Sequence, residues 1–380
     1  MSIEKLSDHK LLYKRTQILN KGYYPKEAYD NFRAFMSTMV KHDSSLEIAG
    51  INIPKGKRRR VEIPIAQLFD ATDMSIPVEI VRGKEKGPIL FVSAALHGDE
   101  INGVEVVKKL LASKRINSRI KGTLIAVPIV NPYGFNRNSR YLPDRRDLNR
   151  CFPGHQKGSL GSQMANTLMK EIVEKSTHGI DLHTGAIHRT NLPQIRACID
   201  DEETSRLAHG FGVPVIINSN TPDGSLRQAA LEKGIPILLY EGDEALRYEQ
   251  KVIEAGLNGV RSVMETIGMI KPKVRKRKKR RDEVFTARSS SWVRAPHSGS
   301  LRVRAKLGAH VKKGELLGEL SNPYGNESFN VLSTRTGIII GMTMLPLVNK
   351  GDAVFHIAVF EDSEAVEERL EIFDEALDTE

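Results

Sequence analysis

The stretch PILFVSAALHGDEINGVEVVKKLLA, Pro88–Ala112, decides the fold. It begins with an apolar run typical of a buried strand, and from about Asn102 its apolar residues recur at the spacing of an amphipathic helix. A strand that runs directly into a helix is the repeating unit of an α/β fold, in which helices cover a mostly parallel sheet. The polar residues His97–Glu100 lie at the junction, on the sheet edge where ligands bind in such folds.

The same alternation extends over a long part of the chain, from Pro77 to about Gly268. Further strand-like runs are TLIAVPIV, GIDLH, PQIRACI, VPVIIN and IPILLYE, and helical patterns separate most of them. We therefore predict a mixed, largely parallel sheet with helices on both faces, and we assign it to residues 76–270. The last helix of the series is expected from about Ala245 to Ile267.

The flanking segments differ in composition from this α/β domain. Residues 1–75 are polar, with a helical pattern near Glu27–Val40, and we interpret them as an N-terminal extension. Residues 271–283 are a basic linker, residues 284–361 contain the short β segments and glycine turns of a separate all-β domain, and residues 362–380 form an acidic tail or exposed helix.

The all-β segment contains a half-repeat, since GAHVKKGELLGEL is echoed by PLVNKGDAVFHIA. Such a repeat resembles the barrel-sandwich domains that carry biotin or lipoate on a lysine. The corresponding hairpin, Asn322–Val331, contains no lysine, so a carrier role is not expected.

The net charge of +10 is concentrated in two short runs. Residues 271–281 carry nine Lys or Arg and residues 55–60 carry five, and without these fourteen the acidic residues outnumber the basic ones. A block of like charge is more often a solvated linker than a nucleic-acid contact, so we favour the linker and keep polyanion binding through 271–281 as the alternative.

The chain has no run of 18 apolar residues, a charged N-terminus and only two cysteines, Cys151 and Cys198. These features predict a cytoplasmic protein that is not embedded in a membrane.

A second histidine follows another predicted strand, in Asp181–Gly185 (DLHTG). Catalytic zinc commonly takes three protein ligands, and two His with one Glu are a standard set. His97, Glu100 and His183 supply that set at one edge of the sheet. Asp181 shares a strand face with His183, so its carboxylate is expected to hold the other ring nitrogen of this ligand. The sequence thus predicts one zinc ion per chain.

A candidate general base ends a third strand, where Ile237–Tyr240 leads into Glu241. Its carboxylate reaches the same edge and could take a proton from water and return it to a leaving amine. The long loop Asn131–Gly161 follows another strand and suits an acidic substrate, because arginine binds carboxylates and stabilises oxyanions. Its arginines include Arg140, Arg145, Arg146 and Arg150.

Four motifs make the chain similar to the succinylglutamate desuccinylase/aspartoacylase family, a branch of the zinc-carboxypeptidase superfamily. In family order they are ALHGDE (Ala95–Glu100), RYLPDRRDLNRCFPG (Arg140–Gly154), DLHTG (Asp181–Gly185) and YEG (Tyr240–Gly242). They fall within residues 77–268, and the β domain matches the usual C-terminal partner of the family.

The resemblance implies that the residues named above hold zinc (His97, Glu100, His183) and transfer protons (Glu241). It also implies that Arg140 polarises the scissile carbonyl and that Asn149 and Arg150 clamp the α-carboxylate of the substrate. The implied reaction is hydrolysis of the amide bond of an N-acyl amino acid, or of a similar small carboxylate-bearing amide, by metal-activated water.

The sequence departs from compact family members in its N-terminal extension, its basic run and two extra residues between Arg140 and Asp147. The acyl pocket is therefore left unassigned. A metallocarboxypeptidase acting on peptide C-termini would use the same zinc, base and clamp. This function therefore remains an alternative hypothesis to the deacylase. A non-catalytic polyanion- or RNA-binding protein that uses residues 271–281 is the alternative from a different class, and a homo-oligomer is also left open.

The remaining polar candidates have no pattern that singles them out. Cys151 lacks a neighbouring general base, so we expect it to pack rather than to react. Arg196 could line the pocket or form an ion pair. Nine histidines lack paired ligand spacing and are expected to be surface or structural residues: His9, His42, His155, His178, His188, His209, His297, His310 and His356.

Overall fold

The structure is a computed structural model that describes residues 45–116, 119–219, 222–272 and 283–378. Residues 47–380 form one compact unit. The helix expected near Glu27–Val40 and positions 273–281 of the basic run lie outside the described residues. None of the helices in the described ranges is long and apolar enough to cross a membrane.

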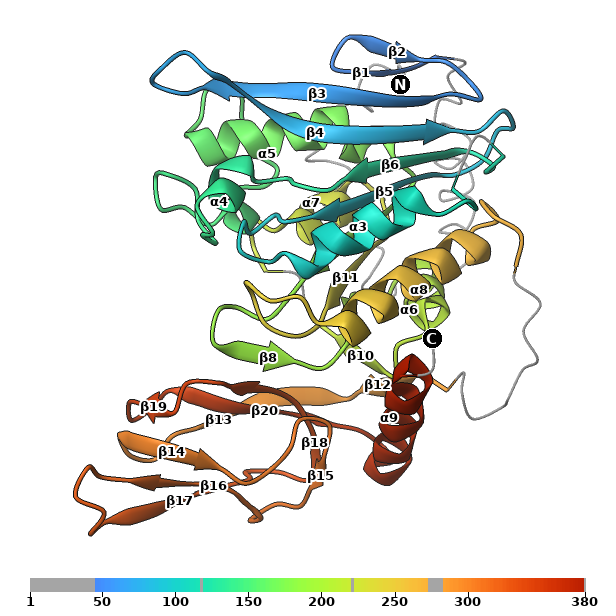
Figure 1. The fold of residues 1–380 in the computed structure, drawn as a ribbon. Coiled ribbons are helices and arrows are strands. Elements are labelled where there is room, and N and C mark those ends of the chain that lie inside the picture. Colours follow the sequence, from blue (N-terminus) through green and yellow to red (C-terminus); the bar gives the residue numbers. More distant parts are fainter. Residues whose placement is uncertain (1–44, 117–118, 220–221, 273–282, 379–380) are drawn as a thin grey trace, which may run out of the picture. The chain divides into compact units, whose positions relative to one another are not determined.

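A nine-stranded sheet is the centre of the described chain, in the order β12-β10-β9-β11-β7-β5-β6-β4-β3 (Figure 1). β5 pairs in parallel with β6 and β7, β7 with β11, and β10 with β9 and β12, while the other pairs are antiparallel. This confirms the predicted mixed, largely parallel sheet. The strands are β3 (Arg58–Gln67), β4 (Asp73–Arg82), β5 (Ile89–Ala94), β6 (Thr123–Val127), β7 (His178–His183), β9 (Gln194–Ala197), β10 (Val215–Asn218), β11 (Ile237–Glu241) and β12 (Phe285–Ala287).

Helices α3 (Asn102–Ala112), α6 (Glu202–Phe211) and α8 (Gln250–Thr266) pack on one face of this sheet. Their apolar stripes share a buried core with alternate strand residues such as Leu90, Val92 and Leu182. Helices α5 (Leu160–Glu171) and α7 (Leu226–Glu232) lie on the other face (Figure 1). Short helical turns occur at α4 (Pro132–Asn136), η2 (Leu148–Arg150) and η3 (Val173–Lys175).

Helix α8 begins five residues later than its sequence pattern suggests. Leu246 has a φ of +59°, which an α-helix cannot accommodate, and its amide donates to the carbonyl of Asp99 at 2.8 Å. The helix starts after Glu249, whose side chain accepts a hydrogen bond from the amide of Lys251. Residues 242–249 therefore form a loop that links Glu241 to α8.

The region from β13 to β20 is all β, as expected, and its strands pair antiparallel. One sheet has the order β13-β20-β18-β15 and the other β17-β16-β14-β19, with a buried core between them that includes Leu301, Leu320 and Phe355. The strands are β13 (Ser289–Arg294), β14 (Gly299–Val303), β15 (His310–Val311), β16 (Leu316–Ser321), β17 (Ser328–Leu332), β18 (Gly337–Thr343), β19 (Leu347–Val348) and β20 (Ala353–Val359).

Sheet boundaries differ from the segment boundaries that composition suggests. At the N-terminal side, β1 (Leu46–Ile48) and β2 (Ile51–Ile53) are short, but β3 and β4 already belong to the central sheet. At the C-terminal side, β12 pairs with β10 of the central sheet, and β8 (Arg189–Asn191) pairs with β18 of the β domain. The two regions thus exchange strands.

The acidic C-terminal segment forms helix α9 (Ser363–Asp378). It is not an exposed tail throughout, because Val366 and Leu370 are buried in a cluster with Ile217 of β10 and Ile340 of β18. The helix therefore covers a seam between the central sheet and the β domain.

Candidate active site

The three predicted metal ligands lie together in the structure. His97 and Glu100 are in the loop between β5 and α3, and His183 is the last residue of β7. Nδ1 of His97 lies 2.6 Å from Oε1 of Glu100, and Nδ1 of His183 lies 2.6 Å from Oε2 of the same carboxylate. The three side chains are buried, and their ligand atoms lie within 4.8 Å of one another. Two imidazoles and one carboxylate therefore meet at a single point.

A carboxylate faces the other nitrogen of each imidazole. Nε2 of His97 lies 3.1 Å from Asp147 Oδ1, and Nε2 of His183 lies 2.7 Å from Asp181 Oδ2. The hydroxyl of Ser93 on β5 donates to Asp181 at 2.7 Å and fixes that carboxylate in turn. Ligand histidines in metal sites usually donate their second N–H to such a group, which orients the ring. Both imidazoles are thus oriented with Nδ1 toward Glu100, and the donor set fits a zinc ion.

The charges of this cluster are strongly coupled. Burial alone raises the pKa of Glu100, but His97 and His183 outweigh it and hold that pKa well below its usual range. Burial lowers the pKa of His183, but Asp181 and Glu100 outweigh it and raise that pKa well above its usual value. Glu100 is consequently a carboxylate at neutral pH, the form that a metal requires.

The backbone around His97 explains the small residues of its motif. A Cβ on Gly98 would lie 2.0 Å from the carbonyl carbon of Gly134, so no other residue fits between the two loops. Ala95 has a φ of +48°, a left-handed conformation that is costly for any residue with a Cβ. Strain of this kind concentrates at functional sites. The chain turns sharply at this point, and the turn places His97 at the edge of the sheet.

Glu241 lies beside this cluster, because it is the direct partner of His183 in the ladder between β11 and β7. Its carboxylate forms an ion pair with Arg196 of β9. The alternative of an ion pair for Arg196 is therefore the one observed, and its partner is the candidate base.

Arg140 bridges two carboxylates next to the cluster. Its guanidinium donates to Glu100 Oε1 at 3.0 Å and to Asp147 Oδ2 at 3.1 Å. Arg140 therefore contacts one of the candidate metal ligands, Glu100, directly. Asp147 thus links His97, Arg140 and the amide of Asn149, which donates to its Oδ1 at 2.8 Å.

Asn149 and Arg150, the two residues of the predicted carboxylate clamp, have different surroundings in the structure. Asn149 is buried, and its side-chain oxygen accepts the amide of Leu226 at the start of α7 at 2.9 Å. Arg150 is exposed, and its guanidinium donates to the carbonyl of Asn149 at 2.6 Å. The structure brings Asn149 near the cluster through Asp147, but it gives Arg150 no contact with the cluster. The thiol of Cys151 has a pKa raised by burial, which favours packing over reactivity.

Sequence reasoning missed several polar residues on the same side of the sheet. Arg227 is buried at the start of α7, and burial together with the nearby Arg196 lowers its pKa to about 10. Gln194 on β9 and His356 on β20 are also buried. A helix-start arginine and a strand glutamine carry no distinctive spacing, and His356 comes from the other end of the chain. Register and long-range pairing were needed to find them.

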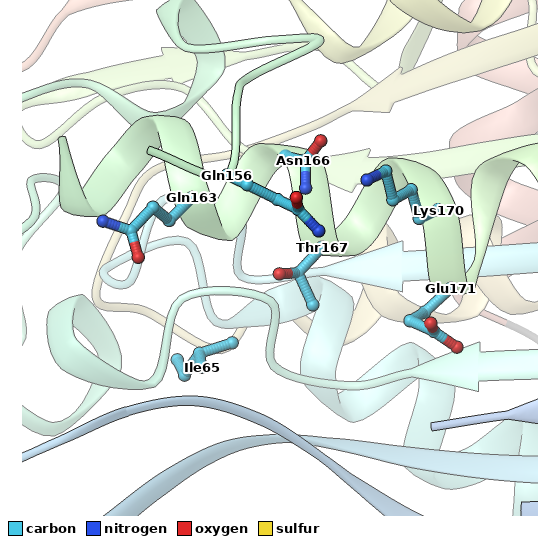
Figure 2. A pocket seen from close by; sticks show the side chains of 7 residues that line it. All are labelled: Ile65, Gln156, Gln163, Asn166, Thr167, Lys170 and Glu171. Atoms are coloured by element: carbon cyan, nitrogen blue, oxygen red, sulfur yellow. The ribbon is translucent and has the colours of Figure 1, made fainter. Parts of the chain in front are cut away.

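A hollow of about 210 Å³ lies elsewhere, between β3 and α5 (Figure 2). Its lining residues are Ile65, Gln156, Gln163, Asn166, Thr167, Lys170 and Glu171, and none belongs to the metal cluster. The carboxylate of Glu171 is already engaged with the amide of Ala49 and with Lys175. This hollow is separate from the candidate active site.

Comparison with known proteins identifies the family to which the central part of the chain is similar. The family model described as the succinylglutamate desuccinylase/aspartoacylase catalytic domain matches residues 86–267. The N-alpha-acetyl-L-2,4-diaminobutyric acid deacetylase of Halomonas elongata is 26% identical over 296 residues, which cover 74% of this chain and 85% of that protein.

Solved structures share the fold. A succinylglutamate desuccinylase from Silicibacter sp. TM1040 is 22% identical with a TM-score of 0.71, over 81% of this chain and 97% of that chain. The product-bound ectoine utilization protein EutE from Ruegeria pomeroyi is 22% identical with a TM-score of 0.72, over 81% of this chain and 97% of that chain. Residues 86–267 therefore form a domain of the succinylglutamate desuccinylase/aspartoacylase family.

Proposed function

We propose that the protein is a zinc-dependent deacylase that hydrolyses the amide bond of an N-acyl amino acid. The observation that carries the proposal is the convergence of His97, Glu100 and His183, with Glu241 as the neighbouring strand partner of His183. The relative from Halomonas elongata is named as a deacetylase of an N-acetylated amino acid, which supports this class of substrate.

In this proposal, different residues of the chain have different roles in the reaction. A zinc ion held by the cluster would supply Lewis-acid polarisation of the substrate carbonyl and acidify water. Glu241 would take the proton from water and return it to the leaving amine, since its carboxylate lies next to the ligand His183. Arg140 would donate to the carbonyl oxygen as negative charge develops there.

The substrate carboxylate is assigned to Asn149 and Arg150. Asn149 is already fixed by Asp147 and Leu226. Arg150 would turn from the carbonyl of Asn149 toward the substrate, because a charged carboxylate is a stronger acceptor than a neutral carbonyl. Asp147 and Asp181 would hold the two imidazoles in place throughout.

The test is a hydrolysis screen with zinc-loaded protein. N-acetyl, N-succinyl and N-formyl amino acids are compared with short peptides, and release of the free amine is measured. Turnover of N-acyl amino acids that is lost in Glu241→Gln is expected. Turnover of peptides from their C-termini instead would favour a metallocarboxypeptidase. No turnover of either class by protein that binds zinc would reject the proposal and favour the polyanion-binding alternative through residues 271–281.

A further inference from the structure

Two basic segments that lie far apart in the sequence meet at one end of the central sheet. The first follows β2 and begins β3, in residues 55–60. The amide of Gly56 donates to the carbonyl of Gly83 at 3.2 Å, and the amide of Gly83 donates to the carbonyl of Gly122 at 2.8 Å. These bonds hold the first segment against the end of β4 and the start of β6.

The second segment starts directly after α8. The amide of Lys121 donates to the carbonyl of Met269 at 2.9 Å, and the guanidinium of Arg115 donates to the carbonyl of Lys271 at 2.6 Å. Lys271 is the first residue of the basic run that follows α8. We refer to the described residues of this region as the basic surface, which comprises residues 55–60, 83–86, 113–116, 119–122 and 271.

The basic surface and the candidate metal site lie at opposite ends of the parallel strands. β5 and β6 begin at this surface, at Ile89 and Thr123. His97 and Glu100 follow the other end of β5, and His183 is the last residue of β7. A partner on the basic surface would therefore leave the metal cluster uncovered.

Some cations of the basic surface have a structural role. The guanidinium of Arg58 donates to the carbonyl of Leu111 in the last turn of α3 at 3.0 Å. The carboxyl end of a helix carries partial negative charge, which a cation stabilises. Carboxylates pair with four of the cations, namely Glu79 with Arg58 and Arg60, Glu85 with Lys121 and Glu265 with Arg115.

Six other cations on the same surface have no such role. All six are exposed, and within the part of the chain that the structure describes their side chains have no partner: Lys55, Lys57, Arg59, Lys84, Lys86 and Lys271. Outside the two basic runs the chain has more acidic than basic residues, so the positive potential is concentrated at this end of the sheet. A concentration of one charge sign attracts partners of the opposite sign.

The basic surface is polar as well as charged. None of the exposed large apolar or aromatic side chains of the described chain belongs to it. Single-stranded nucleic acids are held largely by stacking of their bases on aromatic rings, and peripheral attachment to a bilayer commonly uses inserted apolar side chains. The basic surface therefore suits a partner that offers only phosphates.

The width of the basic surface also suits a row of phosphates. The cations lie at the ends of four neighbouring strands, in the order β5, β6, β4 and β3. Neighbouring strands are about 4.8 Å apart, so these four ends span about 14 Å. A nucleic-acid duplex carries one phosphate charge per about 1.7 Å of its axis, so several phosphates can face the surface at once.

We propose that the basic surface binds the phosphate backbone of a nucleic-acid duplex without reading its sequence. Phosphate contacts position a protein on a duplex, and sequence is read only through the base edges. RNA and DNA duplexes present the same phosphates, so both are candidate ligands. The inference goes beyond the proposed deacylase function and does not depend on it, because the two sites lie at opposite ends of the strands.

The test is a binding measurement by fluorescence anisotropy, with the full chain and short labelled RNA and DNA duplexes over a range of salt concentrations. Both kinds of duplex are expected to bind, and two duplexes of unrelated sequence should bind within about twofold of each other. The logarithm of the binding constant should fall linearly with the logarithm of the salt concentration, by about 0.9 for each phosphate contacted. Binding of one kind of duplex alone would support the proposal and identify its source.

A triple variant tests the assignment to this surface. Lys55→Gln, Lys57→Gln and Lys84→Gln together remove three exposed cations without breaking an ion pair. The size of the salt slope should fall by up to about 2.7, because each lost phosphate contact contributes about 0.9. The matched control makes the same change at three exposed lysines of the β domain and should keep the slope of the wild type: Lys312, Lys313 and Lys350.

Three results would overturn the proposal. One is an equal salt slope in the triple variant and the matched control. Another is binding that is lost when Lys276–Arg281 is neutralised but unchanged in the triple variant, since the basic run outside the described residues would then carry it. The third is a preference for another ligand, either a single strand of the same length or vesicles that contain phosphatidylserine, over the duplexes.

Discussion

Glu241 and His183 are direct partners in the parallel ladder of β11 and β7, so the backbone itself fixes the candidate base beside a candidate metal ligand. Rigid strands place side chains more precisely than loops do, and the pair needs no induced movement to come together. His97 and Glu100, by contrast, lie in the loop that follows β5 and precedes α3.

Replacing the candidate base should lower turnover without affecting zinc binding. Glu241→Gln keeps the size of the side chain and is expected to retain zinc while lowering kcat by roughly 10²-fold or more, because general acid–base help is typically 10²–10⁴-fold. Metal analysis and steady-state kinetics on the same preparation check both parts. Nearly intact kcat in a variant with full zinc would mean that another group moves the proton.

Removal of one imidazole should abolish the metal site. His97→Ala and His183→Ala are each expected to lose about one zinc per chain, because two ligands cannot hold a catalytic zinc as three do. His209→Ala is the control, since this exposed histidine on α6 lies outside the cluster and its ring contacts the carbonyl of Ser205. Zinc content equal to that of the control in either variant would contradict the assignment.

Asp147 should affect the metal without touching it. Asp147→Asn can still accept the amide of Asn149 but loses the charge that faces His97 and Arg140. The affinity for zinc should fall by about 10–100-fold, the usual effect of removing a group that orients a ligand. Competition with a fluorescent chelator measures this. An unchanged affinity would show that His97 is oriented by Glu100 alone.

The stability of the protein should depend on pH through His356. Burial, Arg196 and Arg189 lower its pKa from 6.5 to about 3. Between these values the unfolded chain binds a proton that the folded chain does not, so the free energy of unfolding falls as the pH decreases through this window. The contribution is fully present above pH 6.5 and is lost toward pH 3, by at most about 1.4 kcal/mol per pH unit.

Urea unfolding at a series of pH values, for wild type and His356→Phe, measures this contribution as the difference between two curves. The variant should show a flatter decline below pH 6.5 because it has no imidazole to protonate. Parallel curves would show that His356 is protonated in the folded state as readily as in the unfolded state.

The basic run should matter little to catalysis. Neutralising Lys276–Arg281 is expected to leave kcat/KM on small neutral substrates within about twofold, because salt screens charges beyond about 8–10 Å. Any RNA binding should be weak and fall steeply between low and moderate salt, as counterion release requires. Tight, salt-resistant and sequence-selective binding that disappears on neutralisation would favour the polyanion-binding alternative.

The α/β fold and the metal cluster could be predicted because both depend on local patterns. The apolar runs of the sequence predicted the parallel strands. His97, Glu100 and His183 follow or end two of these strands and lie together at one edge of the central sheet. The family resemblance is likewise confirmed by the match over residues 86–267. The carboxyl ends of neighbouring parallel strands meet at one edge of the sheet, so the sequence pattern predicted that these three side chains would lie together.

The residues that were missed depend on tertiary pairing. The sequence analysis treated His356 as a surface or structural histidine because no paired ligand spacing surrounds it. In the structure β20 places it near Arg196, which lies 160 residues earlier in the chain. The partner of Arg196 was open for the same reason, since only the antiparallel register of β9 with β11 places it beside Glu241. The turn at Leu246 was missed because leucine rarely adopts the left-handed backbone conformation that it has here.

The pairing of β12 with β10 determines what happens when the chain is cut after the central helices. A fragment that ends near residue 270 would leave β10 as a bare edge strand whose sequence, VIIN, is apolar and uncharged. Exposed edges of this kind pair with other chains and lead to aggregation. The catalytic domain should therefore be insoluble when expressed alone, and co-expression with the separate C-terminal half should rescue it, as for two fragments of one cooperative folding unit.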